Sequence, residues 1–198
     1  MTVTDVNVVK SAIFERPDDA NKGTLGSLLC VCGSYGMAGA AVMSAKGALR
    51  TGIGLAKCAL PRSIYPIVAQ TILESVYYPL SENADGRISK VNVPFLVSES
   101  CKSSATLVGC GLGVCDDTLK IVFSLIENST TPLVLDADAL NCVAKQPEIL
   151  LRKKAPIIIT PHPGEMSRLT GLATPLVNAE RERVALDFAQ KYGVVTVL

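Results

Sequence analysis

Short apolar runs alternate with segments of helical period along most of the chain. The runs are apolar at successive positions, a pattern typical of strands buried on both faces. They predict strands at residues 26–32, 53–60, 74–80, 105–108, 132–135, 156–159 and 194–198. Helical patterns lie between them, at residues 37–50, 91–100, 115–127, 166–171 and 178–192. This alternation predicts a doubly wound α/β domain, with a mostly parallel sheet and helices on both faces.

The last apolar run, residues 194–198, ends the chain within a strand pattern at Leu198. A parallel strand buried on both faces is normally followed by a crossover segment that covers it. We therefore expect one domain over residues 1–198 that is incomplete at its C-terminal end; a natural edge strand is the alternative. Because uncovered strands favour pairing between chains, we also expect a homo-oligomer.

Composition excludes several classes of protein. Apolar residues make up 48% of the 198 residues and the formal net charge is +1, with no basic run longer than Arg152-Lys153-Lys154. Nucleic acid is therefore not an expected partner, and the region of Lys153 is interpreted as a solvated helix end. No run approaches the roughly 18 apolar residues of a membrane span. Residues 1–15 lack the pattern of a signal peptide, so a cytoplasmic protein is expected.

The cysteines are interpreted as reduced, buried thiols. They are Cys30, Cys32, Cys58, Cys101, Cys110, Cys115 and Cys142, and none forms a CxxC pair. Zinc sites need closer pairing and further ligands, which a chain with one histidine does not offer. An odd number of cysteines without a signal peptide is typical of a reducing compartment.

Polar and glycine-rich segments follow four of the predicted strands, where parallel sheets bind their ligands. The segment Thr160-Pro161-His162-Pro163-Gly164-Glu165 contains the only histidine, and its prolines restrict the backbone. His162 is either a ligand-binding residue or a histidine satisfied by a local hydrogen bond. Glu165 either holds a metal-bound water or lies in the first turn of a helix, where negative charge is favoured.

Two of the four segments are rich in glycine. Gly33, Gly36 and Gly39 precede one predicted helix, and Gly109-Cys110-Gly111-Leu112-Gly113 precedes another. Glycine lets the backbone approach a ligand closely, and helix N-termini favour anions. Tight turns explain the same glycines equally well, and neither segment matches a dinucleotide or P-loop motif.

The fourth segment, Asp136-Ala137-Asp138-Ala139-Leu140-Asn141, offers carboxylates and an amide. If it is extended, Asp136 and Asp138 point the same way and suit a Mg²⁺ ion or a hydroxyl group. Asp138 as the N-cap of the next helix is the alternative.

Six motifs, taken together and in order, resemble the ADP/ATP-dependent NAD(P)H-hydrate dehydratases, carbohydrate-kinase-related enzymes of the ribokinase-like fold. They are Lys22-Gly23-Thr24-x-Gly26, Gly33-Ser34-Tyr35-Gly36-Met37-Ala38-Gly39-Ala40-Ala41, Ala48-Leu49-Arg50-Thr51-Gly52-x-Gly54-Leu55, Gly109-x-Gly111-Leu112-Gly113, Leu135-Asp136-Ala137-Asp138-Ala139-Leu140-Asn141 and Thr160-Pro161-His162-Pro163-Gly164-Glu165.

The resemblance implies a substrate and a reaction. The substrate is NADHX or NADPHX, whose nicotinamide ring is hydrated, and the added water is removed with ATP or ADP and Mg²⁺. By the motifs, Ala40, Gly113 and His162 contact the hydrated dinucleotide. Glu165 takes the acidic position that organises metal and phosphates in related kinases, with Asp136, Asp138 and Asn141 as further candidates for that role.

Two parts of the family pattern are not among the 198 residues. The family continues after the last predicted strand with a Lys-Gly segment for the adenine nucleotide, and later with a Gly-Ser-Gly-Asp turn that supplies the anion hole and the catalytic aspartate. The catalytic aspartate is therefore expected beyond Leu198, and no catalytic residue is expected within residues 1–198.

Phosphoryl transfer depends almost wholly on positioning and charge. We therefore expect these 198 residues to bind the hydrate weakly and ATP not detectably, and to be inactive alone. A vitamin-precursor or sugar kinase of the same fold and a non-catalytic nucleotide-binding homologue are the alternatives.

Overall fold

The strands of the described residues pair in one parallel sheet with the order β3-β2-β1-β4-β5-β6-β7. The computed structural model describes residues 23–198, so the segment considered for a signal peptide and Lys22 lie outside it. The strands are β1 (Ser27–Val31), β2 (Leu55–Pro61), β3 (Val76–Leu80), β4 (Ala105–Val108), β5 (Leu133–Leu135), β6 (Ile157–Ile159) and β7 (Val195–Thr196).

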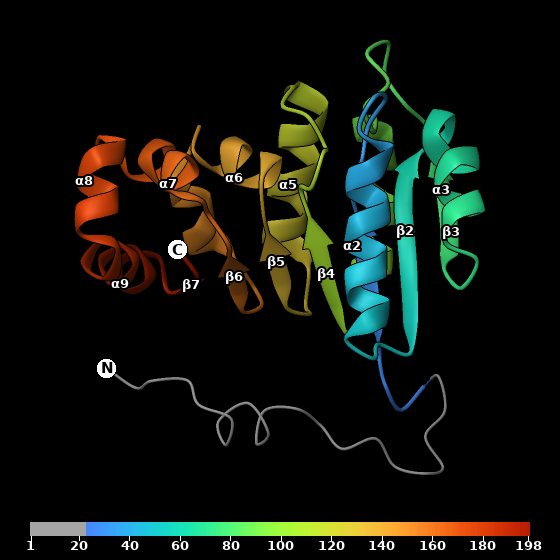
Figure 1. The fold of residues 1–198 in the computed structure, drawn as a ribbon, viewed down its shortest axis with the longest axis horizontal. Helices are drawn as coiled ribbons and strands as arrows, with labels where there is room; N and C mark the ends of the chain where they lie inside the picture. Colours follow the sequence, from blue (N-terminus) through green and yellow to red (C-terminus); the bar gives the residue numbers. More distant parts are fainter. Residues whose placement is uncertain (1–22) are drawn as a thin grey trace.

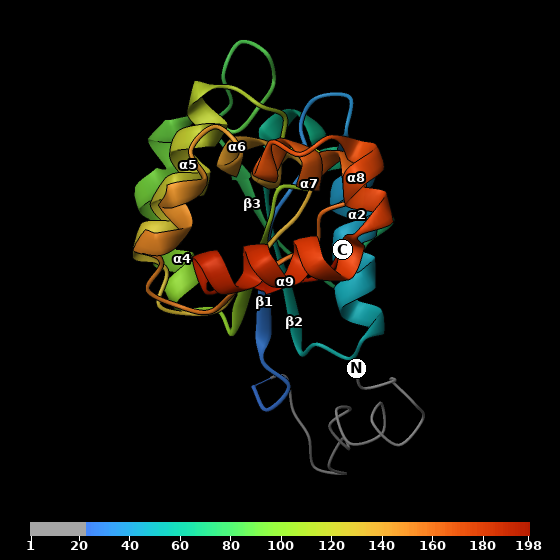
Figure 2. The same cartoon turned by 90° about the vertical axis from the view of Figure 1, so that its left-hand side faces the viewer.

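Helices connect the strands (Figure 1). They are α2 (Ala38–Arg50), α3 (Tyr65–Thr71), α4 (Val93–Cys101), α5 (Asp116–Asn128), α6 (Asp138–Val143), α7 (Pro163–Thr170), α8 (Thr174–Ala179) and α9 (Arg181–Tyr192), with 3₁₀ turns η1 (Arg62–Ile64), η2 (Lys90–Asn92) and η3 (Pro147–Arg152). Figure 2 shows α2 on one side of the sheet and α4 and α5 on the other. The predicted α/β architecture is confirmed.

Alternation along β1 shows why both faces are apolar. Leu29 and Val31 pack in the large core that α4 to α7 and α9 share, whereas Cys30 and Cys32 pack in a smaller core with α2 and α3. A strand between two cores has apolar residues at successive positions. This is the pattern that predicted it.

Of the helix predicted over residues 178–192, residues 181–192 form α9, and residues 178–179 are the end of α8, whose first four residues were not predicted as helix. Glu180 has non-helical dihedral angles (φ −129°, ψ 38°) and separates α8 from α9. One residue therefore divides a segment whose helical period is otherwise continuous.

The strand predicted over residues 194–198 is present but shorter in the structure, where β7 pairs with β6 at Val195 and Thr196. Beyond β7, the backbone of Val197 still donates to Ile159 at 2.9 Å, so the chain continues beside β6. Leu198 lies outside the strand, and its half-buried side chain packs against the large core.

Lys153 also differs from the expectation of a solvated helix end. It follows η3, and its Nζ donates to the carbonyl of Tyr192 at 2.7 Å. A cation at this place satisfies the last carbonyl of α9 and opposes the negative end of the helix dipole.

Candidate functional site

The four segments singled out in the sequence lie together at the carboxyl edge of the sheet. They follow β1, β4, β5 and β6, which are consecutive neighbours in the sheet. The chain leaves β1 toward β2 and leaves β4 toward β5, so its direction across the sheet reverses between β1 and β4. Open parallel sheets bind ligands in the crevice at such a reversal.

The two glycine-rich loops are held against each other at this reversal. The backbone of Gly33 donates to the carbonyl of Cys110 at 2.8 Å. The buried hydroxyl of Ser34 donates to the carbonyl of Gly111 at 2.8 Å. Both glycines have positive φ, 85° at Gly33 and 66° at Gly111, so part of this glycine content is explained by turn geometry.

Ala40 and Gly113, two expected substrate contacts, both lie next to the loop after β4. Ala40 lies in the first turn of α2, and a Cβ on Gly111 would be 2.7 Å from its methyl group. The backbone of Gly113 donates to Asp138 Oδ2 at 2.8 Å. Gly33 and Gly111 are both buried, so Ala40 packs closely against the loop after β4.

Asp138 is the centre of a polar chain that joins three elements. Besides Gly113, it accepts from Asn141 Nδ2 at 3.2 Å through Oδ1. Arg168 on α7 then donates to Asn141 Oδ1 at 3.1 Å. This chain fixes the loop after β4 to α6 and α7, and it fixes the orientation of the Asn141 amide.

The expected pairing of Asp136 with Asp138 is wrong. Ala137 between them has φ 50° and ψ −116°, so the segment is not extended, and Ala137 rather than Asp138 is the N-cap of α6. Asp136 accepts from the thiol of Cys110 at 3.4 Å, whereas Asp138 faces Gly113. The sharp turn gives the two carboxylates different partners.

His162 and Glu165 form the N-terminal cap of α7. The backbone of Gly164 donates to His162 Nδ1 at 3.0 Å, and the backbone of His162 donates to Glu165 Oε2 at 2.9 Å. The other carboxylate oxygen, Oε1, lies 3.3 Å from His162 Nε2. The imidazole is 63% exposed and the carboxylate 8%. The structure therefore places Glu165 in a helix's first turn with both oxygens engaged, and leaves one face of His162 open to a ligand.

If His162 contacts the hydrated dinucleotide, as the resemblance implies, replacing it with alanine is expected to weaken binding by about 1–3 kcal/mol, since one or two hydrogen bonds are lost. Because His162 also caps α7, His162→Asn is the matched variant: asparagine is a good N-cap but has no Nε2. Titration of the hydrate with both variants checks this. If His162→Asn restores full affinity, the histidine only caps the helix.

The described residues offer no metal site made by protein side chains alone. Within residues 23–198, no cluster of three or more His, Cys, Asp or Glu side chains is arranged to hold a metal ion. Asp138 and Glu165 have their oxygens engaged by neighbouring groups. Mg²⁺ often takes some of its ligands from substrate phosphates. The side chains here do not fit a Mg²⁺ ion that is bound without such phosphates.

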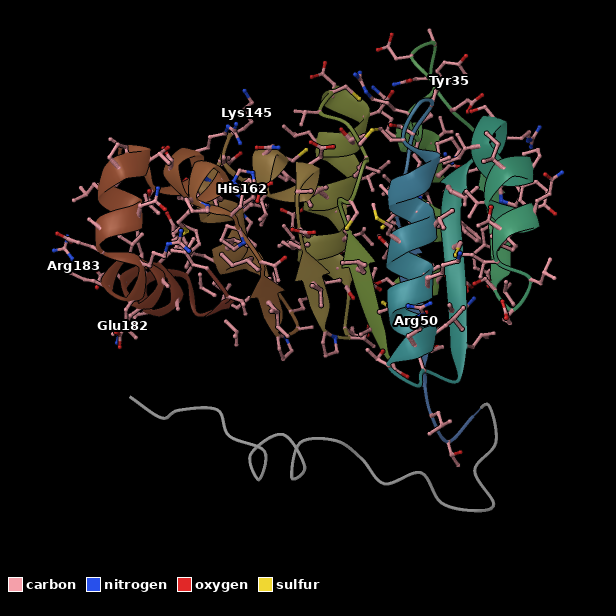
Figure 3. The ribbon with its side chains drawn as sticks, in the orientation of Figure 1. Tyr35, Arg50, Lys145, His162, Glu182 and Arg183 are labelled. Atoms are coloured by element: carbon pink, nitrogen blue, oxygen red, sulfur yellow. The ribbon has the colours of Figure 1, made fainter. Side chains whose placement is uncertain are left out.

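Sequence reasoning missed three cations around Gly113. Arg168 donates to Asn141, and Lys145 follows α6. The side chain of Arg87 packs so closely on Gly113 that a Cβ added to this glycine would clash with the Nε of Arg87. No motif signals them, because they come from separate elements. Figure 3 shows Lys145 and His162 at the upper, carboxyl edge.

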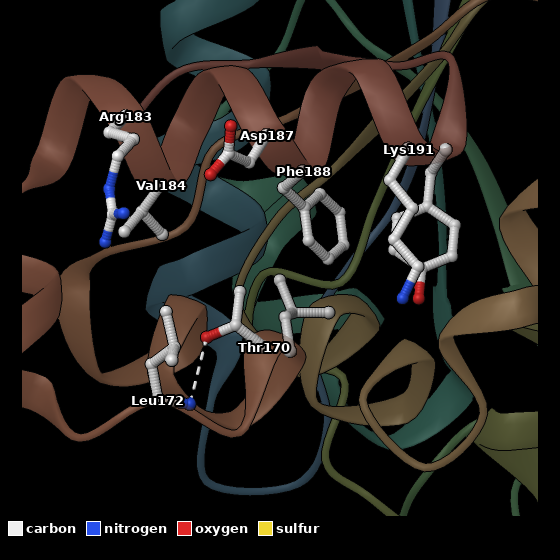
Figure 4. A pocket seen from close by; sticks show the side chains of 9 residues that line it. Thr170, Leu172, Arg183, Val184, Asp187, Phe188 and Lys191 are labelled. Atoms are coloured by element: carbon white, nitrogen blue, oxygen red, sulfur yellow. Dashed lines mark hydrogen bonds between the residues drawn. The ribbon is translucent and has the colours of Figure 1, made fainter.

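A hollow in the surface lies away from the four loops. Figure 4 shows it between α9 and the end of α7, with the Thr170 hydroxyl accepting from the backbone of Leu172 at 3.2 Å. Its volume is 330 Å³, and it is lined by Leu169, Thr170, Leu172, Arg183, Val184, Asp187, Phe188, Lys191 and Tyr192. None of the expected site residues lines it.

The seven cysteines are all free thiols, as expected, but they are not all inert. Burial raises the pKa of Cys142 to about 11. Partial burial also opposes ionisation of Cys115, but hydrogen bonds from Thr118 and the backbone of Asp117 outweigh it and lower the pKa of this thiol. The pKa of Cys110 is lowered as well, by a hydrogen bond from the thiol of Cys32.

We expect an alkylating reagent at pH 8 to label Cys115 at least about 100-fold faster than Cys142, because the thiolate is the nucleophile. Peptide mass spectrometry over a time course measures both rates. In denaturant the two should react alike. Equal rates in the folded protein would contradict the assigned environments.

Comparison with known proteins decides the family. Residues 28–198 match the family model Carb_kinase, which is described as NAD(P)H-hydrate dehydratase. The chain belongs to this family. It is 37% identical over 183 residues to the bifunctional NAD(P)H-hydrate repair enzyme Nnr of Thermofilum pendens, covering 92% of this chain and 35% of that protein. It is 31% identical over 186 residues to the ADP-dependent (S)-NAD(P)H-hydrate dehydratase of Neisseria meningitidis, covering 92% and 58%.

Solved structures of the family have the same fold. The ADP/ATP-dependent NAD(P)H-hydrate dehydratase of Bacillus subtilis, co-crystallised with ATP/Mg²⁺, superimposes with a TM-score of 0.78 at 28% identity, covering 97% of this chain and 64% of that one. A ribokinase-like superfamily protein of Enterococcus faecalis shares the fold at 20% identity with a TM-score of 0.74. The ribokinase-like fold is thus confirmed.

The relatives are longer than this chain. The chain spans about a third of the length of the Thermofilum relative. The described residues end at Leu198, so a catalytic aspartate beyond Leu198 stays a prediction.

Proposed function

We propose that the protein acts in the ADP- or ATP-dependent dehydration of NADHX and NADPHX, and that residues 23–198 supply the side of the site that binds the hydrate. The observation that carries the proposal is the family match over residues 28–198. The Neisseria and Bacillus relatives are named for this reaction.

The position of the expected contacts supports this proposal. Ala40 and Gly113 lie next to the Gly33 and Gly111 loops, which hydrogen bonds hold together where the chain direction reverses across the sheet, and this supports a ligand site there. Gly113, fixed by Asp138, and the open face of His162 would bound the substrate on the other side. We propose Ala40, Gly113 and His162 as the hydrate contacts.

The chain's own residues would bind and orient the hydrate and exclude water from it. The nucleotide supplies the phosphoryl group that converts the ring hydroxyl into a leaving group, and Mg²⁺ would come with its phosphates. Rigid support matters here, because small displacements of a positioned substrate cost orders of magnitude in rate. The hydrogen bonds of Ser34 and Asp138 give the two loops that support.

We further propose a homo-oligomer in the cytoplasm. The seven free thiols suit a reducing compartment. No helix within residues 23–198 combines the length and the apolar character needed to cross a membrane. Size-exclusion chromatography with light scattering measures the assembly, and a monodisperse monomer would contradict it.

The alternative is a small-molecule kinase, which the shared ribokinase-like fold favours. Hydrate binding separates the two functions: we expect NADPHX to bind this chain, and sugars and vitamin precursors not to bind. Dehydration itself is tested by adding ATP or ADP with Mg²⁺ and following the absorbance of reduced nicotinamide. The polypeptide for this assay joins residues 1–198 to the family's Lys-Gly segment and Gly-Ser-Gly-Asp turn. Binding of the kinase substrates with no return of absorbance would overturn the proposal.

A further inference from the structure

A cavity of 510 Å³ opens beside Gly113, outside the Gly33 and Gly111 loops. It is lined by Val114, Asn141, Ala144, Lys145 and Arg168. Two of the lining side chains are cations and none is acidic. The cavity has the size of ordinary small-ligand sites, which lie between roughly 300 and 1,000 Å³.

Neither cation of this cavity has its charge balanced by an ion pair within residues 23–198. Lys145 is exposed and forms no ion pair within residues 23–198. Arg168 donates through one nitrogen to the neutral amide of Asn141 at 3.1 Å. A guanidinium has five N–H donors, so Arg168 keeps donors for a ligand while that bond fixes its position.

The carboxylate that bonds to the lining residue Asn141 is already engaged. Asp138 accepts from the backbone of Gly113 through one oxygen and from Asn141 through the other. Arg87, whose side chain lies against Gly113, pairs with Asp85 at 3.1 Å, so Arg168 and Lys145 are the cations left for a ligand. The surroundings of the cavity therefore favour an anion with several oxygens.

We propose that this cavity is a phosphate subsite, in which Arg168 and Lys145 bind a phosphate group of a ligand whose other end lies on the Gly33 and Gly111 loops. The inference rests on the proposed function for the identity of that ligand. Its phosphate belongs either to the hydrated dinucleotide or to the adenine nucleotide. Both present the same chemistry to the two cations.

Lys145→Gln and Lys145→Glu test the subsite, because this exposed side chain makes no hydrogen bond or ion pair with the rest of residues 23–198. Lys154→Gln is the matched control: Lys154 is also exposed, but it precedes β6 at the opposite edge of the sheet. Calorimetric titrations use inorganic pyrophosphate, NADP⁺ and ADP as probes. We expect Lys145→Gln to weaken pyrophosphate binding roughly three- to tenfold, Lys145→Glu to weaken it further, and Lys154→Gln to leave it unchanged.

The probes also separate the two sources of phosphate. Weaker binding of NADP⁺ with unchanged ADP assigns the subsite to the dinucleotide, and the reverse assigns it to the adenine nucleotide. Pyrophosphate binding that depends on Lys145 supports the subsite even if no dehydratase activity is found, so failure of the proposed function would be recognised separately. Unchanged affinity of all three probes in both Lys145 variants would overturn the proposal.

Discussion

Replacing Gly109 with alanine is expected to lower the free energy of unfolding by roughly 2–5 kcal/mol, from backbone strain and overpacking together. Gly109 has φ 123°, and a Cβ there would lie 2.0 Å from the carbonyl oxygen of Asp136 and 2.7 Å from the backbone nitrogen of Ala139. Both contacts are with backbone, which cannot move aside as a flexible side chain does. Chemical denaturation followed by circular dichroism measures the loss.

Gly47→Ala is the matched control for this substitution. Gly47 lies in the interior of α2, and a Cβ there would meet nothing within 4 Å. Because alanine is the better helix former, Gly47→Ala should raise the stability by about 0.5–1 kcal/mol. Equal stability of the Gly109 and Gly47 variants would contradict the close packing of the β4 and β5 loops.

Replacing Asp138 with alanine is expected to weaken hydrate binding by about 10- to 100-fold, the worth of one or two hydrogen bonds to a charged group. The substitution removes the acceptor for Gly113 and frees the amide of Asn141, so the loop after β4 and Arg168 lose their shared support. Fluorescence or calorimetric titration with NADPHX measures the effect.

Asp116→Ala serves as the control for the lost charge. Asp116 is an exposed carboxylate in the first turn of α5, and its removal should alter hydrate affinity less than about twofold. If Asp116→Ala and Asp138→Ala weaken binding equally, the effect is one of net charge. The polar chain through Asp138 would then have no positioning role.

The sequence predicted the sheet better than the helices at its end. A run such as residues 157–159 is apolar because both its faces are covered, and this signal is local. The break at Glu180 leaves no such mark, because a single residue with non-helical dihedral angles interrupts an otherwise helical pattern. The short helix α3 was not predicted, since Pro66 and the exposed Ile67 give it no clear apolar face.

The site was predicted in outline and missed in its contacts. Strand ends placed the four loops at one edge of the sheet, because parallel strands end on the same side. The turn at Ala137, however, separates Asp136 from Asp138, and the sequence pattern assumed an extended segment. The bond of Arg168 to Asn141 joins residues 27 positions apart, so it depends on how α6 and α7 pack.

Amide hydrogen exchange with saturating NADPHX tests the central claim most directly, because it reports where on the chain the hydrate binds. We expect slower exchange in all four loops at the carboxyl edge, residues 33–37, 109–114, 136–139 and 160–165, with no change in the hollow between α7 and α9. Exchange unchanged in these loops, or slowed only at residues 169–172 and 183–192, would contradict the central claim.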